Sequence, residues 1–158
     1  MDLVWTELPL SLIVSLAEHN DIRAGQIRRQ ETIAPIVVRF AETLLSYGGC
    51  RVVFRFEQTD YAALLEVGTL LAPTYIELRR GQQSECHRNT ARRWRRAKRT
   101  TSIVTGFALT AEDGRWRSHT WLIHSDGHII ETTEERDRYY GIVLTKPQAE
   151  QFVINELS

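Results

Sequence analysis

Apolar residues recur at helical spacing in two stretches near the start of the chain. The first stretch covers residues 8–17, and the second covers residues 33–45. Gly48 and Gly49 follow the second stretch, as the cap of a helix C-terminus would. Both stretches predict helices, so we expect residues 1–49 to form a helical N-terminal part.

From residue 51 onward, β-branched and aromatic runs alternate with further helical periods. The expected elements are a strand over 51–56, a short helix over 60–67, a strand over 74–78, a loop over 80–84, a helix from its cap Ser84 to about Lys98, strands over 102–110, 115–124 and 128–133, and a helix over 147–157. Asp113-Gly114 and Asp126-Gly127 mark the turns between the last three strands. Helices followed by a helix that leads into an antiparallel meander predict an α+β fold, in a single domain over 1–158.

Composition supports a folded chain without disulfide bonds. The 158 residues are 42% hydrophobic and 25% charged, enough for a core of its own. Two cysteines do not make a disulfide framework, and we expect Cys50 to be a small buried side chain. No apolar run is long enough for a membrane span, and the first residues lack the basic region of a signal peptide. These features predict a cytoplasmic protein without membrane contact.

Basic residues are concentrated in one segment although the net charge is zero. The range 88–99 holds seven basic residues and no acid, and five of them share one helix face: Arg88, Arg92, Arg95, Arg96 and Arg99. This face can bind phosphate or an acidic partner, or it can be a solvated surface that pairs with the chain's acids. Trp94 points to the opposite side, so bases have no stacking platform and nucleic-acid binding is not favoured.

Cys86 begins the predicted basic helix and shares its inward face with Thr90 and Trp94. The free N–H groups and positive dipole end of a helix N-terminus favour a thiolate and can stabilise an oxyanion. Gln82 or Gln83 can add a side-chain donor there. His87 is a poor partner for the thiol, because adjacent helix residues point about 100° apart. The alternative is that Cys86 only fills space in the core.

His119 and Glu131 can meet only if the turn between their strands has the right length. A two-residue turn at Asp126-Gly127 puts them on opposite faces of the hairpin. A three-residue loop over 125–127 pairs His124 with His128 and brings His119 diagonally across from Glu131 on one face. A contact between imidazole and carboxylate therefore predicts a bulged three-residue turn. Otherwise Glu131 points to solvent and His119 is an ordinary strand residue.

The order of thiol, imidazole and carboxylate resembles the transglutaminase-like branch of the papain-like fold. The resemblance covers 81–141 and rests on Cys86 at a helix start, His119-Thr120-Trp121 on a strand, and Glu131 with the following threonines on the next strand. It implies a catalytic core in which Cys86 is the nucleophile, His119 the base and acid, and Glu131 the residue that orients His119. Two departures are that the acid is Glu rather than Asp, and that Arg80 stands where papain-type enzymes carry glutamine. The same segment is also similar to small bacterial proteins with a Cys-His-x-Asn helix start.

These residues predict a cysteine-dependent acyl-transfer enzyme acting on a peptide, amide or thioester. Hydrolysis, deamidation and transglutaminase-like transfer share this chemistry. Gln82, Gln83 and Trp121 are the expected oxyanion or substrate contacts. We expect no cofactor and no metal, since His119 and His124 point to opposite faces of their strand. The alternative function is a non-catalytic binding domain of the same fold that holds an acidic or phosphate-bearing partner on the Arg88–Arg99 face.

Overall fold

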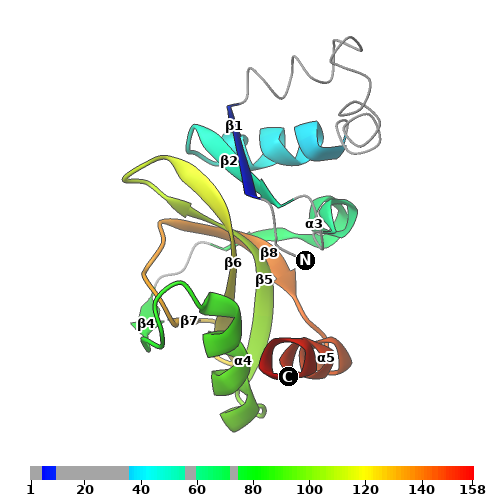
Figure 1. The fold of residues 1–158 in the computed structure, drawn as a ribbon, viewed down its shortest axis with the longest axis vertical. Helices are drawn as coiled ribbons and strands as arrows, with labels where there is room; N and C mark the ends of the chain where they lie inside the picture. The colour runs from blue at the N-terminus through cyan, green and yellow to red at the C-terminus, as the bar shows by residue number, and fades with distance from the viewer. Residues whose placement is uncertain (1–4, 10–35, 56–59, 72–74) are drawn as a thin grey trace. The chain divides into compact units, whose positions relative to one another are not determined.

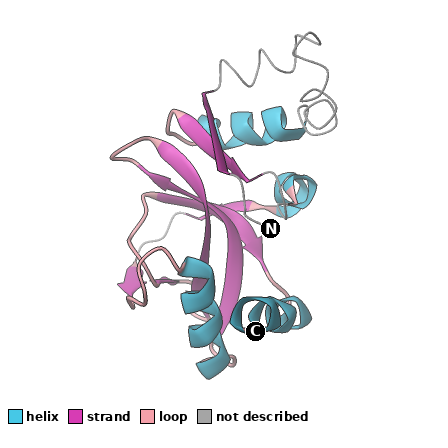
Figure 2. Ribbon diagram, in the orientation of Figure 1, coloured by secondary structure: helices cyan, strands magenta, loops and turns pink. Residues whose placement is uncertain are grey.

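The computed structural model describes residues 5–9, 36–55, 60–71 and 75–158. These residues form an α+β protein whose sheet is mixed and mostly antiparallel, as predicted at the level of fold class (Figures 1 and 2). The chain divides into two compact units. Unit 1 comprises Met1–Gly68 and Leu109–Arg117, and unit 2 comprises Thr69–Ala108 and Ser118–Ser158.

The strands of unit 1 include one that the sequence did not predict. Strand β1 (Trp5–Pro9) pairs antiparallel with β2 (Arg51–Arg55), so that Leu8 lies opposite Val52. The predicted helix from Leu8 is therefore wrong at its start, and its continuation over 10–17 lies outside the described residues. Pairing with another strand overrides a short helical period, because a few apolar residues fit either element.

The helices of unit 1 agree with the prediction. One covers residues 36–46, and α3 (Tyr61–Val67) begins after Asp60, whose carboxylate accepts the Ala63 N–H at 2.9 Å. Phe40 and Tyr61 pack with ring centroids 5.1 Å apart. Cys50 is exposed rather than buried, because it lies in the turn that follows the helix instead of inside β2.

Unit 2 is built on a sheet with the strand order β4-β7-β6-β5-β8-β3. The strands are β3 (Thr69–Leu71), β4 (Ile76–Leu78), β5 (Thr101–Thr110), β6 (Arg115–His124), β7 (Ile129–Glu131) and β8 (Arg138–Val143), of which β5 and β6 extend into unit 1. Strands β6 and β7 are antiparallel, whereas β4 and β7 are parallel. Strands β3 and β8 were not predicted.

Two helices cover one face of this sheet, α4 (Cys86–Arg96) and α5 (Lys146–Leu157) (Figure 1). They enclose a core with members from both helices and three strands: Trp94, Ile103, Leu122, Ile130 and Ala149. A second core lies on other positions of the strands: Val104, Ala108, Trp121, Ile129 and Tyr139. The consecutive residues Trp121 and Leu122 of β6 thus contribute to different cores, as the pleat of a strand requires.

The ends of α4 and α5 differ in how they are capped. Thr145 and Gln148 form a reciprocal capping box at the start of α5. The N-cap of α4 is Glu85, with no side-chain cap bond, so the predicted cap Ser84 is wrong by one residue. Ser84 has a φ of 62°, a left-handed conformation that turns the chain just before the helix. Among the described helices, none is long and apolar enough to cross a membrane.

Candidate active site

The turn between β6 and β7 has three residues and fixes the register of the hairpin. His124 N–H donates to the His128 carbonyl at 2.9 Å, and Gly127 N–H donates to the His124 carbonyl at 2.8 Å. Gly127 has a φ of 97°, which favours glycine at this position. Leu122 consequently lies opposite Ile130. The predicted bulged turn is confirmed.

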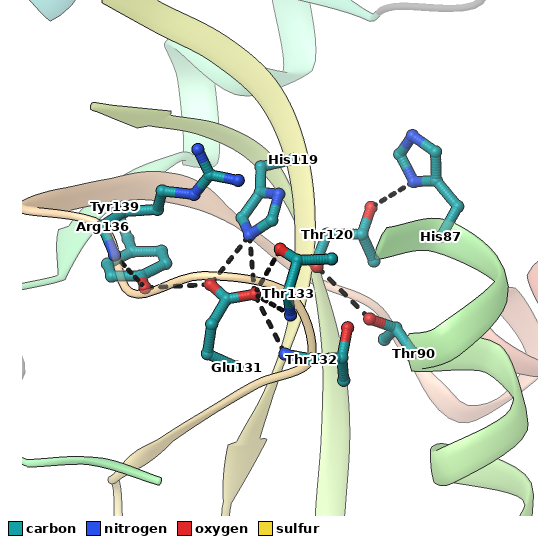
Figure 3. A network of polar contacts seen from close by, with 9 residues as sticks. All are labelled: His87, Thr90, His119, Thr120, Glu131, Thr132, Thr133, Arg136 and Tyr139. Atoms are coloured by element: carbon teal, nitrogen blue, oxygen red, sulfur yellow. Dashed lines mark hydrogen bonds and ion pairs between the residues drawn. The ribbon is translucent and has the colours of Figure 1, made fainter. Parts of the chain in front are cut away.

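This register brings His119 and Glu131 into direct contact. His119 Nε2 lies 2.8 and 3.0 Å from the two carboxylate oxygens of Glu131 (Figure 3). The side chains are buried, with 3% of His119 and none of Glu131 exposed to solvent. The alternative in which Glu131 points to solvent is wrong. A buried imidazole and carboxylate at hydrogen-bonding distance fix the orientation of the ring.

Glu131 accepts hydrogen bonds from every side. Its Oε1 receives the N–H of Thr132 at 3.0 Å and both the N–H and the hydroxyl of Thr133 at 3.2 Å. Its Oε2 receives the hydroxyl of Tyr139 at 3.0 Å (Figure 3). Burial by itself raises the pKa of the Glu131 carboxyl, but the hydrogen bond and charge of His119, with the Thr133 and Tyr139 donors, hold it below 4.5. The carboxylate is therefore ionised at neutral pH.

His119 also interacts with Cys86, the first residue of α4. Burial lowers the pKa of the His119 imidazole, but a hydrogen bond with the Cys86 side chain and the hydrogen bond and charge of Glu131 raise it from 6.5 to about 9. Because Nε2 contacts Glu131, Nδ1 is the ring nitrogen left for the thiol. His119 thus interacts with the other two residues of the sequence-predicted trio, the half-buried Cys86 and the carboxylate of Glu131.

The loop before Cys86 is held in place from two directions. The side chain of Asn89 accepts the Gln82 N–H at 3.1 Å and donates to the Gln82 carbonyl at 2.7 Å. Gly81 N–H donates to the Thr132 carbonyl at 2.8 Å, next to Glu131. A Cβ at Gly81 would lie 2.4 Å from the side chain of Asn89, so a larger residue there would displace the amide that holds Gln82. The two predicted oxyanion residues, Gln82 and Gln83, are exposed on this fixed loop.

Trp121 packs against the ring of His119 inside the core and does not face a substrate. It is fully buried, and its ring stacks on His119 at 5.9 Å and contacts Tyr139 at 4.9 Å. Its predicted place among the substrate contacts is therefore not compatible with its burial. The physical reason is the pleat, which puts Trp121 on the same face as His119 and inside the core.

His87 lies apart from the thiol, as predicted. Its Nδ1 is 2.6 Å from the hydroxyl of Thr120, and its ring meets Phe152 of α5 at 6.1 Å. Thr90 also reaches this strand, because its hydroxyl donates to the Thr120 carbonyl at 3.2 Å (Figure 3). These contacts attach α4 to β6 beside His119.

The predicted arginine face of α4 divides into residues with different surroundings. Arg92 and Arg96 line a cavity together with Arg93, Arg79 and Arg80. Arg88 instead forms a long ion pair with Glu85, at 4.0 Å. Arg95 and Arg99 are exposed and lie outside this cavity.

One group of side chains has the composition of a metal site. The ligand atoms of His124, Asp126 and His128 lie within 4.8 Å of one another at the bulged turn. The two imidazoles stack at 4.8 Å, and Asp126 hydrogen-bonds to His128. Lone pairs of imidazole nitrogens lie in the ring plane, so stacked rings do not direct them at one ion. His119 contacts Glu131 and is not part of this group.

Neither a family model, nor a curated protein, nor a solved structure matches the chain.

Two contacts of the site were not predicted from the sequence. Tyr139 donates to Glu131, whereas the sequence suggested only a place in a substrate cleft or in the core, and Asn89 fixes the loop before Cys86. The signal for Asn89 was its place three residues after Cys86, one helical turn along the same side. No comparable signal marks Tyr139, because strand β8 pairs with β3, which is distant in sequence.

Proposed function

We propose that the chain is a cysteine-dependent acyl-transfer enzyme with Cys86, His119 and Glu131 as its catalytic triad. The observation that carries this proposal is the buried His119, which interacts with both Cys86 and an ionised Glu131 and has a pKa near 9. At neutral pH such a histidine is protonated, and an imidazolium beside a sulfur favours the thiolate. A thiolate and imidazolium pair is the reactive state of a cysteine nucleophile.

In the proposed reaction, the Cys86 thiolate attacks the carbonyl carbon of a peptide, amide or thioester. A carbon–sulfur bond forms, and the carbonyl π electrons move to the oxygen. When the tetrahedral intermediate collapses, the bond to the leaving amine or thiol breaks, and His119 donates its proton to that group. Water or an acceptor amine then attacks the acyl-enzyme, gives a proton to His119, and releases the thiolate. Glu131 keeps the imidazole oriented throughout.

The first turn of α4 supplies the groups that would stabilise the oxyanion. The N–H groups of the first turn have no partner within the helix, and the dipole of α4 is positive at this end. The Cys86 N–H is the nearest of these donors to the attacking sulfur. The exposed amide side chains of Gln82 and Gln83 supply a second donor from the fixed loop.

The arrangement supports a papain-like core of the transglutaminase-like branch. The thiol starts a helix, the imidazole lies on β6 and the carboxylate on the neighbouring β7. This is the order that the sequence resemblance implies. A non-catalytic binding domain is the second candidate, and the observation in its favour is the arginine-lined cavity beside α4.

The test is alkylation of Cys86 by iodoacetamide between pH 5 and pH 9. A Cys50→Ser background removes the exposed second thiol, and the Cys86→Ala chain, in which only Cys50 reacts, supplies the reference. We expect Cys86 to react at a nearly constant rate from pH 6 to pH 8, whereas the rate at an ordinary thiol rises about tenfold per pH unit over this range.

The histidine variants show whether His119 causes this behaviour. His119→Gln and Glu131→Gln should lower the rate at pH 6 by tenfold or more, and His87→Gln, the matched control, should leave it unchanged. Circular dichroism verifies that each variant is folded. If Cys86 follows the Cys50 profile and ignores His119→Gln, the proposed enzyme is rejected.

A further inference from the structure

A cavity of about 300 Å³ lies between the loop that precedes α4 and the outer side of α4 itself. Its lining is strongly basic and consists of Arg79, Arg80, Gly81, Gln82, Asn89, Arg92, Arg93, Arg96 and Thr132. The volume is at the lower end of the range found for small-ligand sites. All of these residues belong to unit 2.

The positive charge of this cavity is poorly balanced by the protein. Arg79 pairs with Glu77 at 2.9 Å, and the charge of Arg93 is also felt at Glu77. The other three arginines, at positions 80, 92 and 96, form no ion pair with a described carboxylate. Guanidinium groups gathered around one space repel each other, and a bound anion relieves that repulsion.

Thr132 also lines this cavity. Its side chain is 1% exposed, yet its hydroxyl has no hydrogen-bond partner among the described residues. An unsatisfied buried hydroxyl is unfavourable, and a ligand oxygen within reach would satisfy it. A buried unpaired donor among arginines therefore points to an oxyanion.

The lining is continuous with the residues that hold the proposed triad. Thr132 follows Glu131 and donates its N–H to that carboxylate. Asn89 lies one turn after Cys86 and holds the Gln82 backbone. A ligand group in the cavity would therefore contact Thr132 next to Glu131 and Asn89, which holds the loop before Cys86.

We propose that this cavity binds a phosphate-class oxyanion carried by the substrate of Cys86. The assignment of this anion to a substrate rests on the function proposed above, whereas the binding of the anion itself does not. A phosphate is favoured over a carboxylate because it carries up to two charges and a tetrahedral set of oxygens, which several arginine forks can engage at once.

Anion binding is tested by calorimetry with inorganic phosphate at low ionic strength, with acetate as the carboxylate probe. Arg92→Gln with Arg96→Gln should weaken phosphate binding tenfold or more. Arg95→Gln with Arg99→Gln removes the same charge from residues outside the cavity and should change the affinity less than threefold. Thr132→Val should weaken it about tenfold, since a hydrogen bond to a charged group is lost.

Acetate should bind at least tenfold more weakly than phosphate, and tight acetate binding would overturn the choice of phosphate. Equal losses in the two double variants would reduce the effect to diffuse charge and reject the site. Absence of phosphate binding by the wild-type chain would also reject it, while the Cys86 alkylation result would stand.

The link to Cys86 is tested with 2-(bromoacetamido)ethyl phosphate as an affinity label, and its alcohol analogue as the uncharged control. The phosphate should accelerate alkylation of Cys86 tenfold or more, and Arg92→Gln with Arg96→Gln should abolish the acceleration. The outer pair, Arg95→Gln with Arg99→Gln, should retain it. If phosphate binds but labelling is not accelerated, the cavity serves a partner and the substrate assignment is overturned. If the pH dependence of Cys86 alkylation is that of an ordinary thiol, the proposed enzyme function is rejected. Calorimetry with phosphate would still test whether the cavity binds an anion.

Discussion

A single buried carboxylate organises the candidate site at the scale of residues. Glu131 has no exposed surface, and its two oxygens receive donors from His119, Thr132, Thr133 and Tyr139. Because burial of a charge is costly, each of these donors contributes to keeping the carboxylate ionised. The proposed proton chemistry of His119 depends on that charge.

Tyr139→Phe should destabilise the protein by about 1–3 kcal/mol, because one donor to the buried carboxylate is lost and the Arg136 N–H loses its acceptor. Urea unfolding at pH 7 measures this change. The control is Tyr75→Phe at an exposed position, where we expect less than about 0.5 kcal/mol. A loss at Tyr139 no larger than the control would show that its hydroxyl does not support Glu131.

Close backbone contact between β5 and β8 determines the position of the site at the scale of elements. A Cβ at Gly106 would lie 2.0 Å from the Tyr140 carbonyl oxygen. A Cβ at Gly141 would lie 2.6 Å from the Thr105 carbonyl oxygen and 2.9 Å from the Trp121 ring. Trp121 in turn stacks on His119. The distance between β5 and β8 therefore sets the position of the Trp121 ring, and the Trp121 ring in turn sets the position of the His119 imidazole.

Gly141→Ala should destabilise the protein by about 1–3 kcal/mol through overpacking, and should slow Cys86 alkylation at pH 6. Trp121→Phe removes the outer part of the indole that the new methyl group would meet. The double variant should therefore lose less stability than the sum of the two single variants. Strict additivity in chemical unfolding would contradict the proposed contact.

The local pattern predicted some elements and their pairing better than others. The hairpin register followed from turn length alone, because the three-residue loop before His128 leaves only one alternation of faces. Strand β8 was missed because Arg138–Val143 shows no polar and apolar alternation, and it forms by pairing with distant strands. The start of β1 was misassigned for the same reason, since pairing with β2 is a non-local interaction.

The candidate trio was predictable, but its surroundings were not. Cys86, His119 and Glu131 came from residue type and order, and the contact of the last two came from the hairpin. The arginine cavity needs Arg79 and Arg80 from one segment and the outer side of α4 from another, and only the tertiary fold brings these together. Trp121 was placed on the correct face, but its complete burial depends on Tyr139 and on β8.

The whole molecule should show the charge of His119 in its stability. The histidine has a pKa of about 9 when folded and 6.5 as its ordinary value, so folding favours the protonated form. In a chain without the Cys86 thiol, this stabilisation is complete below pH 6.5 and is lost as the pH rises through the raised pKa of His119. A Cys86 thiolate releases a proton on folding and offsets this loss, so the dependence is measured in a Cys86→Ser chain. Glu131 behaves in the opposite way, since its lowered pKa means that stability falls as the pH drops below about 4.5.

Urea unfolding between pH 4 and pH 10 measures this dependence. We expect the free energy of unfolding to be greatest between about pH 5 and pH 6.5 and to decline up to pH 9.5. The alkaline decline should be absent in a folded His119→Gln variant. A Cys86→Ser chain whose stability is constant from pH 6.5 to pH 9.5 would show that His119 is not held in its charged form by Glu131.

The length of the bulged turn over residues 125–127 gives a criterion for judging other sequences that contain the same three residues. A chain can keep the cysteine, the histidine and the acid and still lack the site, if its hairpin loop is one residue shorter, because the parity of the strand then separates imidazole from carboxylate. Loop length is thus a criterion that identity at the three positions does not supply. Loop length separates chains in which the histidine and the acid can contact each other from chains in which the same residues lie on opposite faces of the hairpin.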